Sequence, residues 1–530
     1  MVFARRLPAV TALLALVGGS AGCGLLGGSA DEVPEGFVSV SVSQPAGLLP
    51  SSVSDAGGLQ VLGALFTPLV TYDAARTPVE AAARAITSPD RRVWTIALAD
   101  GYTFHNGEPV TAQSYVDAWN YAAYGPNKQR NAYLFERVAG FDETQGAAPA
   151  ATTLSGLKVV NPTTFTVTLV APFVEFPAML GHPAFSPLPG AAFASPGVLA
   201  ADFAKSVVGQ GPFRLAGTFV SGNPIDVRRY DPAVRKARVA GVRFQVYGDP
   251  AQAYTDLTEG DLDVATAIPD DLVADAAREL GDRLLTTPGS SLTMLAFPSA
   301  DRELREPAVR RAISMALDRD ALVAALFPGA EAPARSFVPP TVVGYRADAC
   351  GVPCTFDPAA AKTAYRAAGG PATLRISYNA DGGHQRWVDA TCAQLATNLG
   401  ITCTGSAEAS FETLLAKVRG QQPVGMFRLT WFMDYPSMES YLGPLFTSDG
   451  STNVHRYRNP AFDTTVRTAA AAAGQAAAVA GYARAEAILA RDMPVVPLRF
   501  ALNVTGRASG VDNLALDVFG RVDVAALTVR

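Results

Sequence analysis

Trp431, Asp434 and Tyr435 are the residues whose types and spacing best suit binding chemistry. An ionised Asp carries the charge that a free amine needs, and large aromatic rings beside it exclude water and offer their faces to a cation. The three residues therefore predict a site for a small cationic group. The competing interpretation is a packed turn, in which the rings fill space and Asp434 only favours the turn.

These residues need a strand end and a turn to position them. Residues 427–446 read FRLTWFMDYPSMESYLGPLF, and the first of them alternate between apolar and polar types as in a short strand. Pro436 ends that strand, because proline cannot donate a ladder hydrogen bond and restricts the residue before it. We therefore expect the three residues at a strand end beside a turn.

Strands and helices are predicted in alternation on both sides of the middle of the chain. An alternating pattern predicts a strand at 37–42, further strands are expected at 374–378 and 495–500, and helices are expected at 307–317, 356–370 and 385–399. Thr111 and Asp357 are predicted helix caps. The alanine-rich residues 468–489 predict one long helix or a broken pair. This alternation indicates an α/β fold.

Composition sets the scale of the protein and excludes one class of partner. The chain has 530 residues, of which 49% are hydrophobic and 17% charged, enough for a large core and roughly three domains or fewer large ones. The net charge is −5, and no block of basic residues interleaved with aromatic ones is present. We therefore expect no nucleic-acid partner.

The first residues predict export. Arg5-Arg6 precede an apolar run at 7–17 and then small residues up to Cys23, which is the pattern of a signal peptide and too short for a membrane span. Ser20-Ala21-Gly22-Cys23 is similar to a bacterial lipobox, although Ser20 stands where that pattern prefers leucine. We expect a signal peptide at 1–22, lipidation of Cys23 and a tether at 23–36. Ordinary cleavage nearby is the alternative.

The other cysteines predict disulfides. Cys350, Cys354, Cys392 and Cys403 allow three pairings, of which Cys350–Cys354 and Cys392–Cys403 are favoured in an exported chain. A zinc site is the competing interpretation, but a Cys-x3-Cys spacing without a nearby histidine suits it poorly. The four histidines (His105, His182, His384 and His455) have no metal-binding spacing, so no metal or cofactor is expected.

A catalytic function has weak support. Ser155 and Lys158 form a Ser-x-x-Lys match, but an acyl-transfer site needs that motif at a helix start, and here it runs into a predicted strand. After the predicted signal peptide, the sequence contains neither a Gly-x-Ser-x-Gly nor a His-Glu-x-x-His motif. We therefore expect a protein that is not an enzyme.

Seven segments, taken in order, resemble a known family. The chain is similar to the extracytoplasmic solute-binding proteins, family 5, of oligopeptide, dipeptide and nickel ABC importers. The resemblance departs from the family at Ser114, where the family usually has Asp. The matching segments cover almost the whole mature chain and lie at 101–112, 208–215, 258–264, 306–320, 357–370, 431–436 and 482–498.

This resemblance implies a three-lobed, clamshell-like periplasmic-binding-protein fold of class II, cluster C type. Lobe I would comprise 37–58, 155–268 and 497–530, lobe II would be an insertion at 59–154, and lobe III would span 269–496. The lobes would close on a ligand held between lobes I and III. The protein would be a monomer anchored by lipid to the outer face of the cell membrane. It would deliver its ligand to permease subunits served by cytoplasmic ATPases, and would touch the membrane through the lipid anchor only.

The resemblance also implies a ligand and roles for residues. In peptide-binding relatives the Asp of the Trp-x-x-Asp-Tyr motif holds the peptide's α-ammonium, which assigns that role to Asp434 and a wall role to Trp431 and Tyr435. Dipeptide binders place an arginine in the loop matching 378–385, and residues 379–385 contain none. His384 and Arg386 are then the candidates for the ligand carboxylate, and an oligopeptide is favoured over a strict dipeptide. The alternatives are a nickel chelate, haem, a sugar or another small molecule, a sensor on the same fold, or an exported hydrolase.

Overall fold

The computed structural model describes residues 33–530, of which residues 36–530 form one compact unit. The predicted signal peptide at 1–22, the predicted lipidation site Cys23 and most of the predicted tether lie outside the described residues. The sheets, helices and cavity of the described residues lie in the unit from Gly36 to Arg530.

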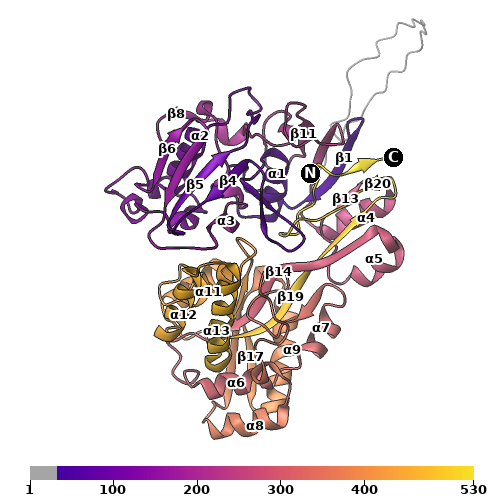
Figure 1. The fold of residues 1–530 in the computed structure, drawn as a ribbon. Helices are drawn as coiled ribbons and strands as arrows, with labels where there is room; N and C mark the ends of the chain where they lie inside the picture. The colour runs from indigo at the N-terminus through magenta and orange to yellow at the C-terminus, as the bar shows by residue number, and fades with distance from the viewer. Residues whose placement is uncertain (1–32) are drawn as a thin grey trace, which may run out of the picture. The chain divides into compact units, whose positions relative to one another are not determined.

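An 11-stranded mixed sheet is the main element of the unit (Figure 1). β1 pairs in parallel with β12, whereas β14 pairs antiparallel with both β18 and β19. The strands follow one another in space as β10 (Phe213–Leu215), β11 (Ile225–Arg229), β12 (Gly241–Val246), β1 (Phe37–Val42), β13 (Val264–Ala265), β19 (Val495–Arg507), β14 (Leu284–Ala296), β18 (Met426–Trp431), β16 (Thr373–Asn379) and β17 (Thr402–Glu408), and β15 (Glu331–Pro333) pairs with β19.

A separate four-stranded antiparallel sheet is built from residues between 83 and 168. Its order is β4 (Ala83–Thr87), β5 (Val93–Leu98), β7 (Thr164–Thr168) and β6 (Leu157–Asn161). Lys158 lies within β6, so the Ser-x-x-Lys match enters a strand as expected. Three two-stranded sheets join β2 (Val70–Tyr72) to β3 (Pro78–Glu80), β8 (Phe193–Ser195) to β9 (Val198–Leu199) and β20 (Val511–Asp512) to β21 (Thr528–Val529).

Helices flank the sheets, and their ends match the sequence signals. Thr111 caps α2 in a capping box with Ser114, and Asp357 caps α8 with Pro358 in the first turn, as predicted. The alanine-rich stretch is a broken pair that separates before Gly474. The helices are α1 (Ala56–Leu65), α2 (Ala112–Ala123), α3 (Phe176–Met179), α4 (Pro250–Glu259), α5 (Val273–Leu280), α6 (Pro307–Met315), α7 (Arg319–Leu326), α8 (Pro358–Ala367), α9 (Gln385–Leu395), α10 (Phe411–Arg419), α11 (Glu439–Phe446), α12 (Pro460–Ala470) and α13 (Gln475–Asp492).

The apolar interior divides into three cores. The first contains β1, α1, α2 and the four-stranded sheet, the second contains residues between 292 and 500, and a third, smaller core lies around α4 and α5. The 13-residue strands β14 and β19 pair along their length and pass from the third core into the second (Figure 1). The lobe boundaries given above stay a prediction.

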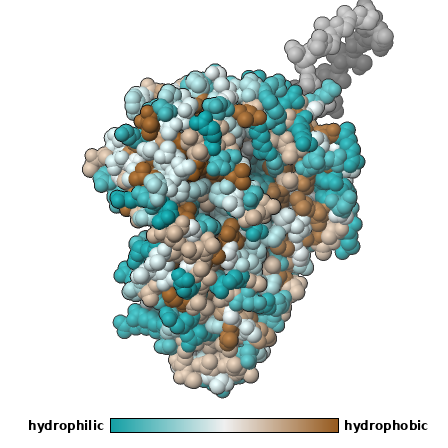
Figure 2. All heavy atoms as spheres, in the orientation of Figure 1, coloured by the Kyte–Doolittle hydropathy of each residue, from teal (hydrophilic) through white to brown (hydrophobic). Residues whose placement is uncertain are grey.

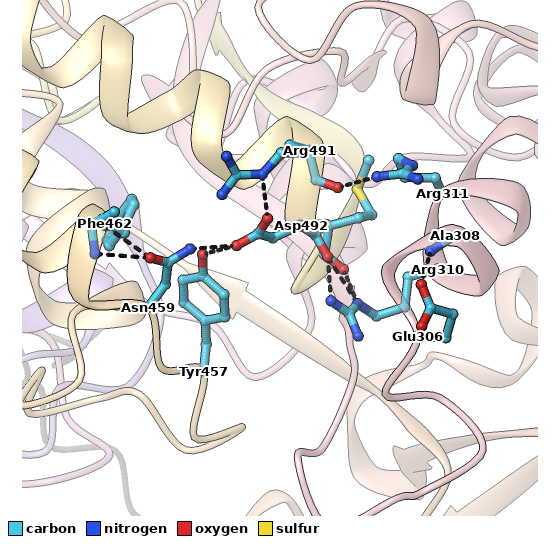
Figure 3. A network of polar contacts seen from close by, with 11 residues as sticks. Glu306, Ala308, Arg310, Arg311, Tyr457, Asn459, Phe462, Arg491 and Asp492 are labelled. Carbon is cyan, nitrogen blue, oxygen red and sulfur yellow. Dashed lines mark hydrogen bonds and ion pairs between the residues drawn. The ribbon is translucent and has the colours of Figure 1, made fainter.

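A polar network fixes the turn from α13 into β19 (Figure 3). Arg310 of α6 is buried and donates hydrogen bonds to the backbone carbonyl oxygens of Asp492, the last residue of α13, and Met493, which caps that helix. The carboxylate of Asp492 accepts hydrogen bonds from Tyr457 Oη (2.7 Å), Asn459 Nδ2 (2.6 Å) and the neighbouring arginine Nε (2.8 Å). The end of α13 is therefore held by buried polar groups whose hydrogen-bond donors and acceptors are paired.

Candidate functional site

A cavity of about 700 Å³ lies where the end of β1, the middle of β14 and β19, and the turn after β18 meet. Its volume is in the range of small-molecule sites. Asp434 and Arg521 are the charged residues that line it. Arg521 is already paired with Asp517, with Nη2 and Oδ2 2.6 Å apart. Asp434 has no basic partner among residues 33–530, so its charge is available to a ligand.

The two long strands contribute an irregularity to this cavity. The register shifts between Pro288 and Leu292 of β14, whose partners are Leu502 and Phe500, so that three residues of β14 lie opposite one residue of β19. A break of this kind bends a strand and turns side chains away from the regular ladder. The three residues of the break, at 289–291, all line the cavity.

Asp434 lies in the turn after β18, where the sequence places it. Its backbone N–H donates to Ser440 Oγ (2.8 Å), and its Oδ1 accepts a hydrogen bond from Tyr133 Oη (2.8 Å). Burial raises the pKa of Asp434 to about 7, Tyr133 opposes that shift, and the nearby carboxylates of Glu439 and Glu136 add to it. The carboxylate thus has one donor where it could accept several, and the electrostatic cost of its charge leaves it about half protonated at neutral pH in the empty protein.

Tyr133 is a site residue that the sequence did not reveal. It belongs to the 3₁₀ turn η2 (Ala132–Phe135) and lines the cavity. It lies 301 residues before Asp434 in the chain, so the contact depends on tertiary structure. No local pattern around Tyr133 signals this role.

Trp431 and Tyr435 lie behind the turn and are not among the residues that line the cavity. Trp431 Nε1 donates to the carbonyl oxygen of Ser440 (2.8 Å), and the buried Tyr435 hydroxyl donates to the carboxylate of Glu439. Both residues therefore stabilise the turn on the side that faces away from the cavity. Phe432 and Met433 contribute the apolar surface instead, and the Phe432 side chain is 62% exposed.

Three further carboxyl groups, those of Glu136, Glu175 and Glu439, lie on the side of this turn that faces away from the cavity. Glu439 is fully buried and pairs with Arg137, whose guanidinium stacks on Phe173 at 4.1 Å. Burial raises the pKa of Glu175 to about 7, although Gln475 donates to it, and burial also raises the pKa of Glu136. With Asp434 there are four carboxyl groups and one arginine in this group, which we call the acidic end of β18. Its excess of carboxyl groups favours a cation.

His384 and Arg386, the predicted contacts for a ligand carboxylate, do not line the cavity either. His384 Nδ1 accepts a hydrogen bond from Trp387 Nε1 (3.2 Å), while Arg386 is exposed at the start of α9. Burial lowers the pKa of His384 to about 4, helped by the charges of Arg428 and Arg499, so the ring is neutral. Their role in binding stays a prediction.

Arg428 is a second residue that the sequence analysis missed. It is buried on β18, its Nε donates to Asn379 Oδ1 (2.6 Å), and it stacks on Phe411 at 4.2 Å. It does not line the cavity, and it precedes Asp434 by six positions, which at about 3.3 Å per extended residue is at most about 20 Å. The signal for it was a charged residue at an inward position of a strand, in the run MFRLTW.

The structure contains both disulfides in the favoured pairing, Cys350 with Cys354 and Cys392 with Cys403. Within residues 33–530, no three His, Cys, Asp or Glu side chains are grouped so as to hold a metal ion. In the same range no helix combines the length and the apolar character that a membrane crossing requires.

The sequence of the chain identifies its family. Residues 77–453 match the bacterial extracellular solute-binding proteins, family 5 Middle. The match spans more than half of the chain, which therefore belongs to this family. It is a non-catalytic, extracytoplasmic solute-binding protein of an ABC import system.

Individual relatives agree over nearly the full length. The chain is 26% identical to the periplasmic murein peptide-binding protein MppA of Escherichia coli, covering 88% of this chain and 90% of MppA. It is 26% identical to the periplasmic oligopeptide-binding protein OppA of Salmonella typhimurium (83% of this chain, 82% of OppA). It is 23% identical to the glutathione-binding protein GsiB of the same species (82% of this chain, 87% of GsiB).

Solved structures give the fold. The unliganded open form of MppA superposes with a TM-score of 0.77 at 23% identity, covering 94% of this chain and 98% of MppA. The ABC transporter substrate-binding protein CtaP of Listeria monocytogenes gives a TM-score of 0.80 at 20% identity, covering 93% and 99%. The predicted α/β periplasmic-binding-protein fold is therefore confirmed.

Proposed function

We propose that this protein binds peptides with a free amino terminus, oligopeptides rather than only dipeptides, and delivers them to an ABC permease. The observation that carries the proposal is Asp434, a cavity-lining carboxylate with a single hydroxyl donor and no basic partner in the described part of the chain. An ammonium group would supply the missing charge and up to three hydrogen bonds, each worth about 1.5–3 kcal/mol when one partner is charged.

The remaining lining supports a ligand whose backbone, and not its side chains, is recognised. Around Asp434 the cavity wall is mainly apolar, with Phe432 and Met433 among its residues, and neutral polar groups such as Ser41, Ser43 and Ser290 are interspersed in it. Hydroxyl and amide groups can pair with peptide N–H and C=O groups whatever the peptide sequence. Three of the relatives are named for binding murein peptides, oligopeptides and glutathione, all of which are peptides in chemistry.

The carboxyl end of the ligand has less structural support than the amino end at Asp434. We propose that the carboxylate of a longer peptide lies toward His384, Arg386 and Arg428. Arg428 supports this assignment, because it places a guanidinium on the strand that leads to Asp434. Only a ligand of several residues would reach from Asp434 to these side chains, because none of them lines the cavity that contains Asp434.

The cellular setting is part of the same proposal. The mature chain would begin at Cys23, which would carry the lipid, and residues 23–36 would tether the lobes defined above to the outer face of the cell membrane. Export is supported by the two disulfides.

The test compares matched peptides by calorimetry. A tri- to pentapeptide with a free amino terminus should bind at least ten-fold more tightly than its N-acetylated twin, because acetylation removes a charge-assisted contact of about 1.5–3 kcal/mol. The C-amidated twin serves as a control that tests the far end separately. Equal affinities for the free and acetylated peptides would contradict the role of Asp434. Failure to bind any peptide would contradict the proposed function.

A further inference from the structure

A group of basic side chains lies at one end of four neighbouring strands, far along the sheet from β18. β1 and β12 begin at this end, β11 finishes here and β10 starts here, as shown by the pairs Phe37 with Gly241 and Phe213 with Arg229. The loop from β11 to β12 covers the same end. The exposed basic residues here, which we call the basic face, are Arg214, Arg228, Arg229, Arg235, Lys236 and Arg238.

Two of these residues form an unfavourable pair. Arg214 and Arg228 lie directly opposite each other on β10 and β11, where like charges destabilise a sheet. Gly241 lies beyond Arg228 in the same row, and its missing side chain makes room for the ring of Phe37, since a Cβ there would lie 2.3 Å from Phe37 Cζ. Arg228 stacks on that ring at 5.2 Å. The face thus keeps two adjacent guanidinium groups exposed.

The nearby carboxylates neutralise only part of this face. Asp226 forms a two-bond pair with Arg243 underneath it, while Asp231 pairs with Arg229 and Asp523 pairs with Arg235. The other four basic residues of the face have no acidic partner among residues 33–530. Residues 213–243 contain seven basic and two acidic residues, a net charge of +5 in a chain whose net charge is −5. A solvated surface explains scattered charges, but it does not explain this local excess in an acidic protein.

The position of this face in the chain indicates its partner. The backbone oxygen of Gly36 accepts a hydrogen bond from the N–H of Ala240, so the chain enters the compact unit beside the loop that carries Arg235, Lys236 and Arg238. Twelve residues lie between Cys23 and Gly36, and the thirteen residue-to-residue steps span at most about 45 Å. A lipid on Cys23 would therefore keep the basic face close to the bilayer.

We propose that the basic face binds the anionic phospholipid headgroups of the membrane that carries the protein. Figure 2 shows a largely hydrophilic surface over β1 and β11, at the upper right of the view. Guanidinium groups bind phosphate oxygens through paired hydrogen bonds, and basic groups are attracted to an anionic leaflet. This contact adds to the lipid anchor. It rests on the proposed export and lipidation, but not on the identity of the ligand.

The experiment is vesicle flotation with the chain from residue 24 onward, which retains every described helix, strand and core but has no lipid. Vesicles of phosphatidylcholine are compared with vesicles that also contain phosphatidylglycerol, at low and at high salt. We expect binding only to the anionic vesicles and only at low salt. The variant Arg214→Gln/Arg228→Gln/Arg238→Gln should lower the partition coefficient roughly 100-fold, at about five-fold per basic residue.

The matched control is Arg302→Gln/Arg366→Gln/Arg419→Gln, which removes the same charge from exposed sites between 292 and 500. It should bind anionic vesicles like the unmodified protein, and both variants should keep their melting temperature and their peptide affinity. Equal losses in the two variants, or equal binding to neutral vesicles, would overturn the proposal. So would unchanged vesicle binding by the first variant together with lost transport in cells, which would assign the face to the permease.

Discussion

Asp434 and Asp492 are both acidic residues next to a buried polar network, and they differ in how many donors they have. Asp492 accepts hydrogen bonds from three side chains and lies in a tightly packed turn (Figure 3). Asp434 accepts one hydrogen bond from Tyr133 and lines a cavity. Burial raises the pKa of both, but at Asp492 the hydrogen bonds more than offset it and the pKa is lowered, whereas at Asp434 the pKa is raised to about 7.

The difference separates a carboxylate that holds the fold from one that is available for binding. A fully matched carboxylate stabilises the folded state, because it prefers its surroundings to water. An under-matched one destabilises the empty protein and recovers that energy when a cation arrives. Substitution of Asp492 should therefore lower folding stability, and substitution of Asp434 should lower binding affinity.

The largest effect is expected at Asp492. Asp492→Ala removes three accepted hydrogen bonds and should lower the free energy of unfolding by about 3 kcal/mol. Chemical denaturation at neutral pH measures it. Since the folded pKa of Asp492 is lowered, its contribution is present above the ordinary carboxyl pKa and is lost as pH falls through the folded value, so the variant and the unmodified protein should converge in acid. A difference that persists unchanged in acid would assign the loss to packing.

Asp434→Asn should lower peptide affinity without lowering stability, the opposite of Asp492→Ala. We expect peptide affinity to fall about 10- to 150-fold, which corresponds to the 1.5–3 kcal/mol of a charge-assisted contact. Calorimetry with a free and an N-acetylated peptide checks this, because the variant should bind the two equally. Its stability at neutral pH should be equal to or above that of the unmodified protein, since the folded pKa is raised and the charged form is disfavoured. A large drop in melting temperature would mean that Asp434 is structural like Asp492.

The smallest effect is a pH dependence of binding. Because an ammonium pairs only with ionised Asp434, and the pKa of that group is about 7 in the empty protein, affinity should fall about ten-fold between about pH 8 and about pH 6. Glu175, whose pKa burial also raises to about 7, titrates in the same range. Asp434→Asn is therefore the control, and its affinity should show a flatter pH profile. An affinity of the unmodified protein that rises as the pH is lowered would contradict the comparison.

What could be predicted from sequence was local. The strand before Pro436 and the caps at Thr111 and Asp357 follow from residue preferences within a few positions, and the structure contains all of them. The alanine-rich stretch was predicted as one long helix or a broken pair, and the structure contains the broken pair. The placement of Asp434 at a turn followed from the same reasoning.

What could not be predicted depends on contacts across the chain. Tyr133 reaches Asp434 only because the fold brings together residues 301 positions apart. Phe432 faces the cavity while Trp431 and Tyr435 pack behind the turn, and their hydrogen bonds to Ser440 and Glu439 decide that orientation. The basic face was missed because its basic residues are spread over two strands and a loop, and no single run of sequence shows the pair at 214 and 228.

The exposed ring of Phe432 has a consequence for the heat of binding. A phenylalanine that is 62% exposed presents on the order of 100 Å² of apolar surface to water. Any ligand that covers it removes this surface, and the heat capacity falls by about 0.45 cal/mol/K for each Å². A peptide that covers this ring, even one made only of glycine, should then bind with a more negative heat-capacity change than it does to the Phe432→Ala variant, because the protein supplies apolar surface that the peptide lacks.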